Sequence, residues 1–237
     1  MALIKEYADL IKSLPVGGQF TKIKRDSKFW DPTNTEFSDD VKEVVKAVFD
    51  ECSGDERYIN ISRDDIKEAI ATKEKTSDTK EIIVKILMWG YPRGGQYGQV
   101  KKILKKLNDL TTWLEENKGN NFDSVQDDAL GNLLEINGLG LSTISKLLYF
   151  FDVKIGNIPC QIYDNKVIDS LNINHQIDEL SSRNDWEQTY DDYENYINLL
   201  SELSENCECS PDKIKPDQIE LFLFMINNSF NLGKDEK

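Results

Sequence analysis

The sequence has little of what common hydrolytic and metal-dependent sites require. Its 237 residues include one histidine, His175, and four cysteines. Four thiols are too few and too widely spaced for a disulfide scaffold, and the pair Cys207 and Cys209 fits neither zinc nor iron–sulfur spacing. A mechanism that needs a histidine base or ligand would have to use His175 alone. We therefore expect no metal centre, no zinc-hydrolase chemistry and no Ser-His-Asp chemistry.

Long hydrophobic runs are also absent. Mean hydropathy is -0.54. The longest apolar runs, Leu147–Phe151 and Leu221–Ile226, are far shorter than the roughly 20 residues that span a bilayer. The first residues show no basic-then-apolar signal pattern. The sequence thus predicts a soluble, globular, cytoplasmic protein with no membrane partner.

Positive charge is scarce as well. The formal net charge of -14 argues against a nonspecific nucleic-acid binder, because Lys and Arg supply most of the affinity for phosphates. The acidic excess lies mainly in residues 151–237, whereas residues 1–150 are nearly neutral. Lys101 and Lys105 would share one face of a helix, with Lys102 and Lys106 beside them. This face is either a contact to the DNA backbone or an ordinary solvated surface.

Apolar residues recur at helical spacing along most of the chain, and period-two alternation is rare. The sequence therefore predicts an all-α fold in one compact helical body, with two lobes around a cleft as an open possibility. Residues 1–75 are expected to form an N-terminal helical segment packed on a main domain of residues 76–237. Ser62 and Asp65 predict a capping box at a helix start. The expected helices cover residues 3–13, 39–52, 64–75, 79–89, 99–117, 125–136, 142–151, 165–171, 185–203 and 217–230.

A short glycine turn separates two of these helices. One helix ends at Ile136, the turn Gly138-Leu139-Gly140 follows, and the next helix begins near Ser142. Residues 125–151 thus have the pattern of a helix-hairpin-helix. Glycines allow backbone conformations and close approaches that a side chain would block, so the N–H groups of the turn and of the helix start can bind a DNA phosphate. The alternative is a plain turn between helices with a glycine C-cap.

About twenty residues after the turn, within residues 158–171, an aspartate begins a new helix. The segment Tyr163-Asp164-Asn165-Lys166-Val167 resembles the Val-Asp-x-x-Val segment that follows the hairpin in the helix-hairpin-helix DNA glycosylase superfamily. The resemblance implies that Asp164 is catalytic, since a fixed carboxylate stabilises the oxocarbenium-like sugar as the base departs. Asp164 is also a good residue for an ordinary helix N-cap, and the two roles are compatible.

Bifunctional members of this superfamily use a hairpin lysine as nucleophile, two residues after the second glycine. Ser142 stands at that position here, and Lys146 lies one helical turn further on the same face. Lys146 precedes Asp164 by 18 positions, about the separation that the superfamily keeps. Lys146 is thus either the nucleophile of a glycosylase with lyase activity or a contact to phosphate or solvent. In the second case the enzyme uses water and leaves an abasic site.

Two further segments resemble the 8-oxoguanine DNA glycosylases and the small bacterial proteins of that fold. These enzymes have a C-terminal helix with Gln and Phe four residues apart, where this sequence has Glu220 and Phe224 in the expected base-pocket helix of residues 215–230. The resemblance implies that Glu220 accepts hydrogen bonds from a flipped base and that Phe224 stacks on it. Glu in place of Gln leaves the lesion open. Trp89 begins a similar Trp-Gly-Tyr segment and can line the same pocket. The alternative for the C-terminal helix is that its aromatic residues simply pack in the core. The alternative for the Trp-Gly-Tyr segment is an ordinary connecting loop.

Together these features predict a DNA glycosylase that excises a damaged or modified base, such as 8-oxoguanine, from double-stranded DNA. The DNA would bind at the turn of Gly138, Leu139, Gly140 and Ser142. The superfamily resemblance implies a potassium or sodium ion at the hairpin carbonyls, and no other cofactor is expected. We expect a cytoplasmic, nucleoid-associated bacterial monomer. A noncatalytic helix-hairpin-helix DNA-binding module and a helical protein-interaction domain with an acidic contact surface remain open alternatives.

Overall fold

The computed structural model describes residues 2–73, 76–95, 98–134, 136, 138–173, 190–206 and 213–232. His175, Cys207 and Cys209 lie outside these ranges. The described chain is mostly helical, as expected, but it also contains two small sheets, so the expectation of an all-α fold was wrong in this respect. The chain forms two compact units, here called unit 1 (residues 1–16, 121–127 and 154–237) and unit 2 (residues 17–120 and 128–153). The division at residue 75 stays a prediction.

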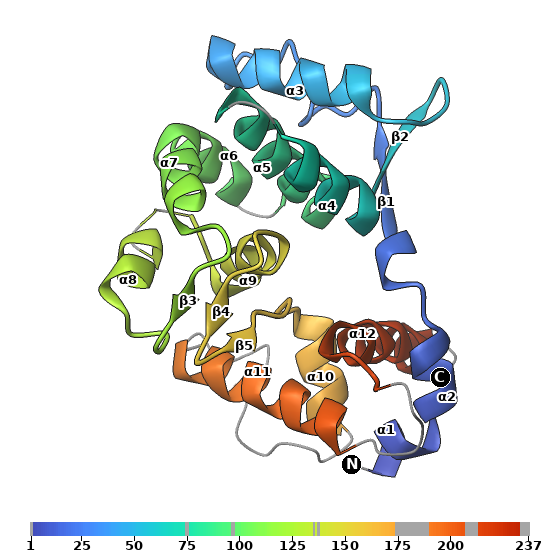
Figure 1. Ribbon diagram of the computed structural model, residues 1–237. Coiled ribbons are helices and arrows are strands. Elements are labelled where there is room, and N and C mark those ends of the chain that lie inside the picture. Colours follow the sequence, from blue (N-terminus) through green and yellow to red (C-terminus); the bar gives the residue numbers. More distant parts are fainter. Residues whose placement is uncertain are drawn as a thin grey trace. The chain divides into compact units, whose positions relative to one another are not determined.

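Unit 2 contains a two-stranded ribbon and the helices α3 to α9 (Figure 1). The 3-10 turn η1 (Val16–Gly18) leads into it. The elements are β1 (Phe20–Lys24), α3 (Asp39–Glu51), β2 (Tyr58–Ser62), α4 (Arg63–Thr72), α5 (Thr76–Gly90), α6 (Gln99–Leu104), α7 (Leu107–Asn117), α8 (Asp128–Leu134) and α9 (Leu141–Phe150).

Helix α5 is the centre of unit 2. It contacts α3, α4, α7, α9 and both strands of the ribbon. Ile83, Val84, Ile86 and Leu87 of this helix are fully buried, as expected for a helix that is apolar on most of its circumference. The ribbon is antiparallel and pairs Phe20 to Lys24 with Ser62 to Tyr58. The core of unit 2 is therefore assembled around one helix.

One predicted helix start is confirmed, and two of the predicted helices are each divided in two. The capping box of Ser62 and Asp65 is confirmed at the start of α4. The helix expected over residues 99–117 is two helices, because the N–H of Lys106 donates to the carbonyl of Ile103 at 2.8 Å and tightens the last turn of α6. The helix expected over residues 3–13 is likewise divided, at Tyr7.

In unit 1, the last helix packs against three other helices. The elements are α1 (Ala2–Glu6), α2 (Ala8–Ser13), β3 (Asn121–Phe122), β4 (Lys154–Ile155), β5 (Ile158–Pro159), α10 (Asn165–Ile173), α11 (Tyr190–Glu205) and α12 (Pro216–Leu232). Strand β4 pairs in parallel with β3 and antiparallel with β5. Helix α12 packs against α10, α11 and α2, and Gln218 Nε2 donates to the carbonyl of Lys12 at 2.8 Å. Among the described helices, none is long and apolar enough to cross a membrane.

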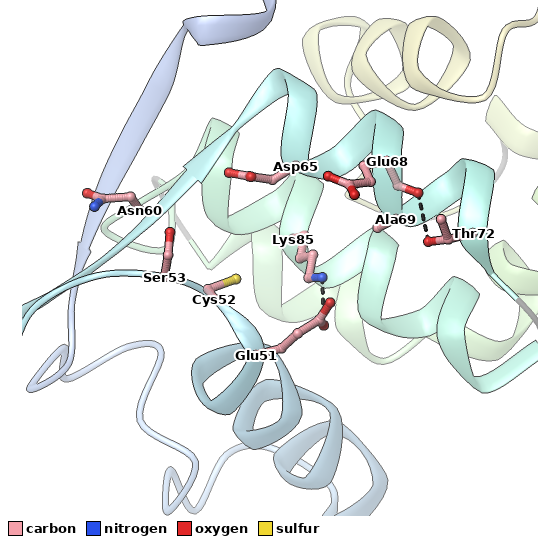
Figure 2. Close-up of a pocket in the computed structure, with 9 residues that line it drawn as sticks. All are labelled: Glu51, Cys52, Ser53, Asn60, Asp65, Glu68, Ala69, Thr72 and Lys85. Carbon is pink, nitrogen blue, oxygen red and sulfur yellow. Dashed lines mark hydrogen bonds and ion pairs between the residues drawn. The ribbon is translucent and has the colours of Figure 1, made fainter.

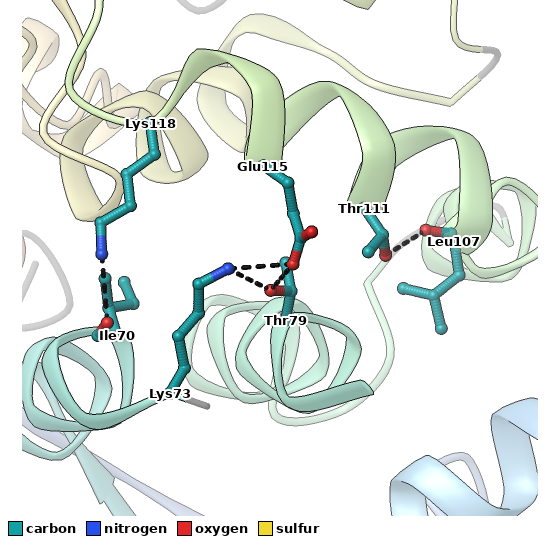
Figure 3. A network of polar contacts seen from close by, with 7 residues as sticks. All are labelled: Ile70, Lys73, Thr79, Leu107, Thr111, Glu115 and Lys118. Atoms are coloured by element: carbon teal, nitrogen blue, oxygen red, sulfur yellow. Dashed lines mark hydrogen bonds and ion pairs between the residues drawn. The ribbon is translucent and has the colours of Figure 1, made fainter. Parts of the chain in front are cut away.

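A polar network ties three helical segments of unit 2 together (Figure 3). Lys73 follows α4, and its Nζ lies 2.9 Å from Oγ1 of Thr79 in α5 and 2.9 Å from Oε1 of Glu115 in α7. The Thr79 hydroxyl donates to the same carboxylate oxygen at 2.5 Å. Because Thr79 is fully buried, Glu115 is an acceptor that water cannot readily replace.

Replacing Glu115 with Ala should lower the free energy of unfolding by about 1–3 kcal/mol, because it leaves the buried Thr79 hydroxyl without this acceptor. Urea denaturation followed by circular dichroism measures the change. Lys106→Ala is the matched control, since it breaks the exposed Lys106–Asp109 pair and should cost roughly 0.5 kcal/mol or less. Equal losses in the two variants would show that the network adds nothing to an ordinary surface pair.

Candidate functional site

The turn between α8 and α9 rests on the start of α6. Gly138 has φ 99°, a conformation that favours glycine. A Cβ at Gly138 would lie 2.9 Å from the Cβ of Lys102 and 3.1 Å from the carbonyl oxygen of Gln99. At Gly140, the N-cap of α9, a Cβ would lie 3.3 Å from the side-chain nitrogen of Gln99. The absence of side chains at both positions lets the turn pack closely on α6.

The backbone groups of the turn are partly used within it. The N–H of Leu139 donates to the carbonyl of Ile136 at 3.1 Å, and the Leu139 side chain is buried. The carbonyl of Gly140 accepts from the N–H groups of Thr143 and Ile144 at 2.8 and 3.0 Å. The N–H groups at the very start of α9, including that of Ser142, come before the first intrahelical bond. These groups are the ones suited to a phosphate.

The two predicted DNA-binding lysines belong to α6 and the residue that follows it. Lys101 forms an ion pair with Glu36 and lies 5.9 Å from the ring centroid of Phe29. Lys105 caps the C-terminal end of α6 and is exposed. Since the turn touches Lys102 of the same helix, the turn and the lysines are neighbours in unit 2.

Lys146 lies on the buried side of α9. Its side chain is 4% exposed, and Nζ donates to the carbonyl and hydroxyl oxygens of Ser142, each at 2.8 Å. The separation of four residues brings the amine back by one helical turn, toward the helix start. The amine therefore lies beside the side chain that stands two residues after Gly140.

Gly90 and Tyr91 shape the space along the Lys146 side chain. A Cβ on Gly90, the last residue of α5, would lie 3.1 Å from Cδ and 3.2 Å from Cε of Lys146. The amine is 5.7 Å from the ring centroid of Tyr91, whose hydroxyl lies 2.6 Å from that of Thr143. The two residues thus contact both Lys146 and the first turn of α9. The Trp-Gly-Tyr segment stands out in the sequence, but its contact with Lys146 could not be predicted from it.

Trp89 is 7% exposed and packs inside unit 2. Its ring meets Phe150 edge-on at 5.6 Å, and the guanidinium of Arg63 lies 5.3 Å from the ring centroid. Its indole N–H donates to the carbonyl of Gln19 at 3.3 Å. These contacts give Trp89 a packing role, and its place in a base pocket stays a prediction.

Asp164 stands immediately before α10 and is half-buried. Its carboxylate accepts the N–H of Lys166 at 2.9 Å. Its carbonyl accepts the N–H groups of Val167 and Ile168 at 2.9 and 3.1 Å. These are the bonds of a helix N-cap, so the side chain is held in one place at the end of a helix whose dipole favours negative charge.

The predicted base-pocket residues lie on α12, in the same unit as Asp164. Phe224 is half-buried, and Nζ of Lys166 lies 4.6 Å from its ring centroid. Glu220, one turn earlier on the same helix face, is 1% exposed. Lys166 therefore contacts Asp164 through its backbone and Phe224 through its side chain. Asp164, Glu220 and Phe224 belong to unit 1, whereas Lys146, Trp89 and the glycine turn belong to unit 2.

A known protein family matches most of the chain. The family described as "Putative 8-oxoguanine DNA glycosylase OGG-like protein" matches residues 25–224. The chain belongs to this OGG-like family. No curated protein and no solved structure gives a match. The matched region contains all the predicted site residues and ends at Phe224.

A reactive cysteine and a bound metal ion are two other kinds of catalytic centre. Burial raises the pKa of the Cys160 thiol to about 12 and that of the Cys52 thiol to about 11, so both are protonated, and weak nucleophiles, near neutral pH. Among the described residues, no group of three or more His, Cys, Asp or Glu side chains is placed to hold a metal ion.

Figure 2 shows a pocket of about 300 Å³ that is lined by residues from α3, β2, α4 and α5 of the OGG-like chain. Nζ of Lys85 lies 2.7 Å from the carboxylate of Glu51 at this pocket. The Asp65 carboxylate that lines it is used in the capping box with Ser62. None of the predicted site residues lines this pocket.

Replacing Gly138 with Ala should lower the free energy of unfolding by about 1–3 kcal/mol, because alanine rarely adopts the positive φ and its Cβ would crowd Lys102 and Gln99. Gly131→Ala is the control: Gly131 lies in α8, and a Cβ added there would meet nothing within 4 Å, so alanine should be neutral or stabilise by up to about 1 kcal/mol. Denaturant titration of both variants checks the contrast. A stable Gly138→Ala protein would contradict the close approach of the turn to α6.

Proposed function

We propose that this OGG-like protein is a DNA glycosylase that excises a damaged or modified base, an 8-oxoguanine-like purine, from double-stranded DNA. The observation that carries the proposal is the Asp164 carboxylate, fixed at the start of α10 within the region that matches the family. A carboxylate that is held in one place can stabilise the cation that forms when an N-glycosidic bond breaks.

Asp164 supplies the electrostatic part of the reaction. As the bond between the base and C1′ breaks, the electron pair leaves with the base and the sugar acquires positive charge. A carboxylate that is already oriented stabilises this charge without the cost of reorganisation. The Lys166 N–H that holds Asp164 fixes its position before DNA arrives. Glu220 and Phe224 would bind the flipped base by its edge and its face.

DNA binding is proposed at the turn between α8 and α9, with Lys101 and Lys105 as contacts to the backbone. A turn that offers N–H groups needs few basic side chains, which reconciles DNA binding with the net charge of -14. A potassium or sodium ion at the turn remains part of the proposal. The Gly140 carbonyl accepts two N–H groups and that of Ile136 accepts the N–H of Leu139. No step of the proposed reaction depends on the ion.

Lys146 is proposed as the nucleophile of an associated lyase step. Its amine lies at the Ser142 side chain, the position at which the superfamily pattern places the attacking lysine. Nitrogen would form a bond to C1′ as the base leaves with the electron pair of the broken bond. The nitrogen then loses its protons, and a C=N bond forms as the C1′–O4′ ring bond breaks and O4′ takes up a proton. Loss of a proton from C2′ of this imine then expels the 3′ phosphate. The bonds to Ser142 orient the amine and must be exchanged when it attacks.

Asp164→Asn tests the central step. Asn caps helices about as well as Asp, so the fold should persist, while loss of the charge should slow base release by about 100-fold or more. The wild type is first incubated with duplexes that carry different modified bases, and alkali then reveals abasic product. The substrate found is used to measure single-turnover rates of the variant.

Asp191→Asn is the matched control, because Asp191 is an exposed carboxylate in the first turn of α11 and its replacement should leave the rate unchanged. DNA binding without base release from any duplex would favour the noncatalytic module. No DNA binding even at low salt would favour the protein-interaction domain. Either result overturns the glycosylase proposal.

Lys146→Met tests the lyase step. Methionine fills similar space without an amine, so borohydride should no longer trap the protein on DNA that carries the excised lesion. Lys67→Met is the control. Lys67 lies in α4, and its amine is 4.7 Å from the ring centroid of Tyr149, a residue of α9 like Lys146. Loss of the Lys67 amine should leave trapping intact. Undiminished trapping of Lys146→Met would assign the attack to a different amine.

A further inference from the structure

The segment that leads to Asp164 is buried without being helix or strand. Cys160, Gln161, Ile162 and Tyr163 are each no more than 4% exposed, and residues 160–164 belong to no regular element. Buried carbonyl groups in such a segment need hydrogen-bond donors from elsewhere in the chain, because an unsatisfied carbonyl is costly. One helix, α11, supplies donors here.

Two tyrosines of α11 bond to consecutive carbonyls of this segment. The Tyr193 hydroxyl donates to the carbonyl of Gln161 at 2.9 Å, and the Tyr196 hydroxyl donates to that of Ile162 at 2.8 Å. Their spacing of three residues puts both on one face of the helix. Both are buried, at 1% and 0% exposed, so water does not readily replace either bond.

The same tyrosines also hold the residue next to the carboxylate. The ring of Tyr163 meets those of Tyr193 and Tyr196 edge-on, with centroids 6.2 and 5.2 Å apart. On the far side of Asp164, α10 is tied to α12 by the Ser170 hydroxyl, which donates to the carbonyl of Leu223 at 2.8 Å. Asp164 thus lies between a segment anchored on α11 and a helix anchored on α12.

We propose that Tyr193 and Tyr196 are positioning residues for the Asp164 carboxylate, an inference that rests on the proposed glycosylase function. The three residues before Asp164 belong to no strand or helix, and two of their three carbonyls accept a hydrogen bond from these hydroxyls. A displacement of about 1 Å at a reacting group can cost about 100-fold in rate. The two hydroxyls therefore set where the carboxylate meets the developing sugar cation.

Tyr193→Phe, Tyr196→Phe and the double variant test the proposal, because each removes one or both hydroxyl groups and keeps the rings. We expect single-turnover base release to fall by about 10–100-fold, with affinity for the lesion duplex unchanged. Thr111→Val is the matched control, since it removes a buried hydroxyl that donates to the carbonyl of Leu107 in unit 2. It should leave the rate unchanged when all proteins are measured well below their melting temperatures.

A second measurement does not depend on catalysis. Hydrogen exchange of the Lys166 amide, followed by NMR, reports the bond to the Asp164 carboxylate. Exchange should be faster in the tyrosine variants than in wild type and unchanged in Thr111→Val. If wild type releases no base, the proposed function fails, and the exchange alone decides whether the tyrosines hold Asp164.

The rate of base release and the exchange of the Lys166 amide together decide the positioning role. Slower base release together with faster exchange of the Lys166 amide supports the positioning role. A rate equal to that of wild type overturns it, even if exchange changes, because the hydroxyls would then serve folding only. A slower rate with unchanged exchange also overturns it, since the effect would not pass through the Asp164 cap.

Discussion

The first turn of α10 is the constraint on which the proposed site depends. Asp164 completes that turn by accepting the Lys166 N–H, and the same bond leaves the carboxylate in a single, half-buried position. A helix start thus provides in one residue what many enzymes obtain from a histidine and its partners: a fixed charge at a defined point. This is consistent with a sequence that contains one histidine, because glycosidic cleavage needs stabilisation of a cation more than it needs a base near pH 7.

The parts of the fold that carry a local chemical signal could be predicted from the sequence. The capping box of Ser62 and Asp65 is such a signal, and α4 starts there. The break between α6 and α7 could not be predicted, because the apolar spacing continues through Leu104 and Leu107 and only the bond from Lys106 to Ile103 ends the helix. Neither strand of the ribbon was predicted. Ile23 is the one buried residue of β1, so that strand carries no alternating pattern, whereas Ile59 and Ile61 of β2 are buried at alternate positions and could have indicated a strand.

The candidate site likewise has features that the sequence could predict and features that it could not. The capping by Asp164 and the shared helix face of Ser142 and Lys146 follow from positions close together in the sequence, and both are present. The space that Gly90 leaves for Lys146 joins residues more than fifty positions apart, and no local pattern reports it. Tyr193 and Tyr196 are similar: their spacing looks like that of any buried helix face until the carbonyls that they bind are known.

In unit 1, Lys166 contacts both the proposed catalytic residue and one residue of the proposed base pocket. Its backbone N–H holds Asp164, and its ammonium lies 4.6 Å from the centroid of the Phe224 ring. A base that stacks on Phe224 must therefore use the opposite face of the ring or displace this ammonium, since one face cannot hold both. If the base uses the opposite face, the cation keeps Phe224 in place and α10 is unchanged by binding. If the base displaces the ammonium, the Lys166 side chain must move. Binding of the base then changes the surroundings of Lys166, the residue whose N–H holds the Asp164 carboxylate.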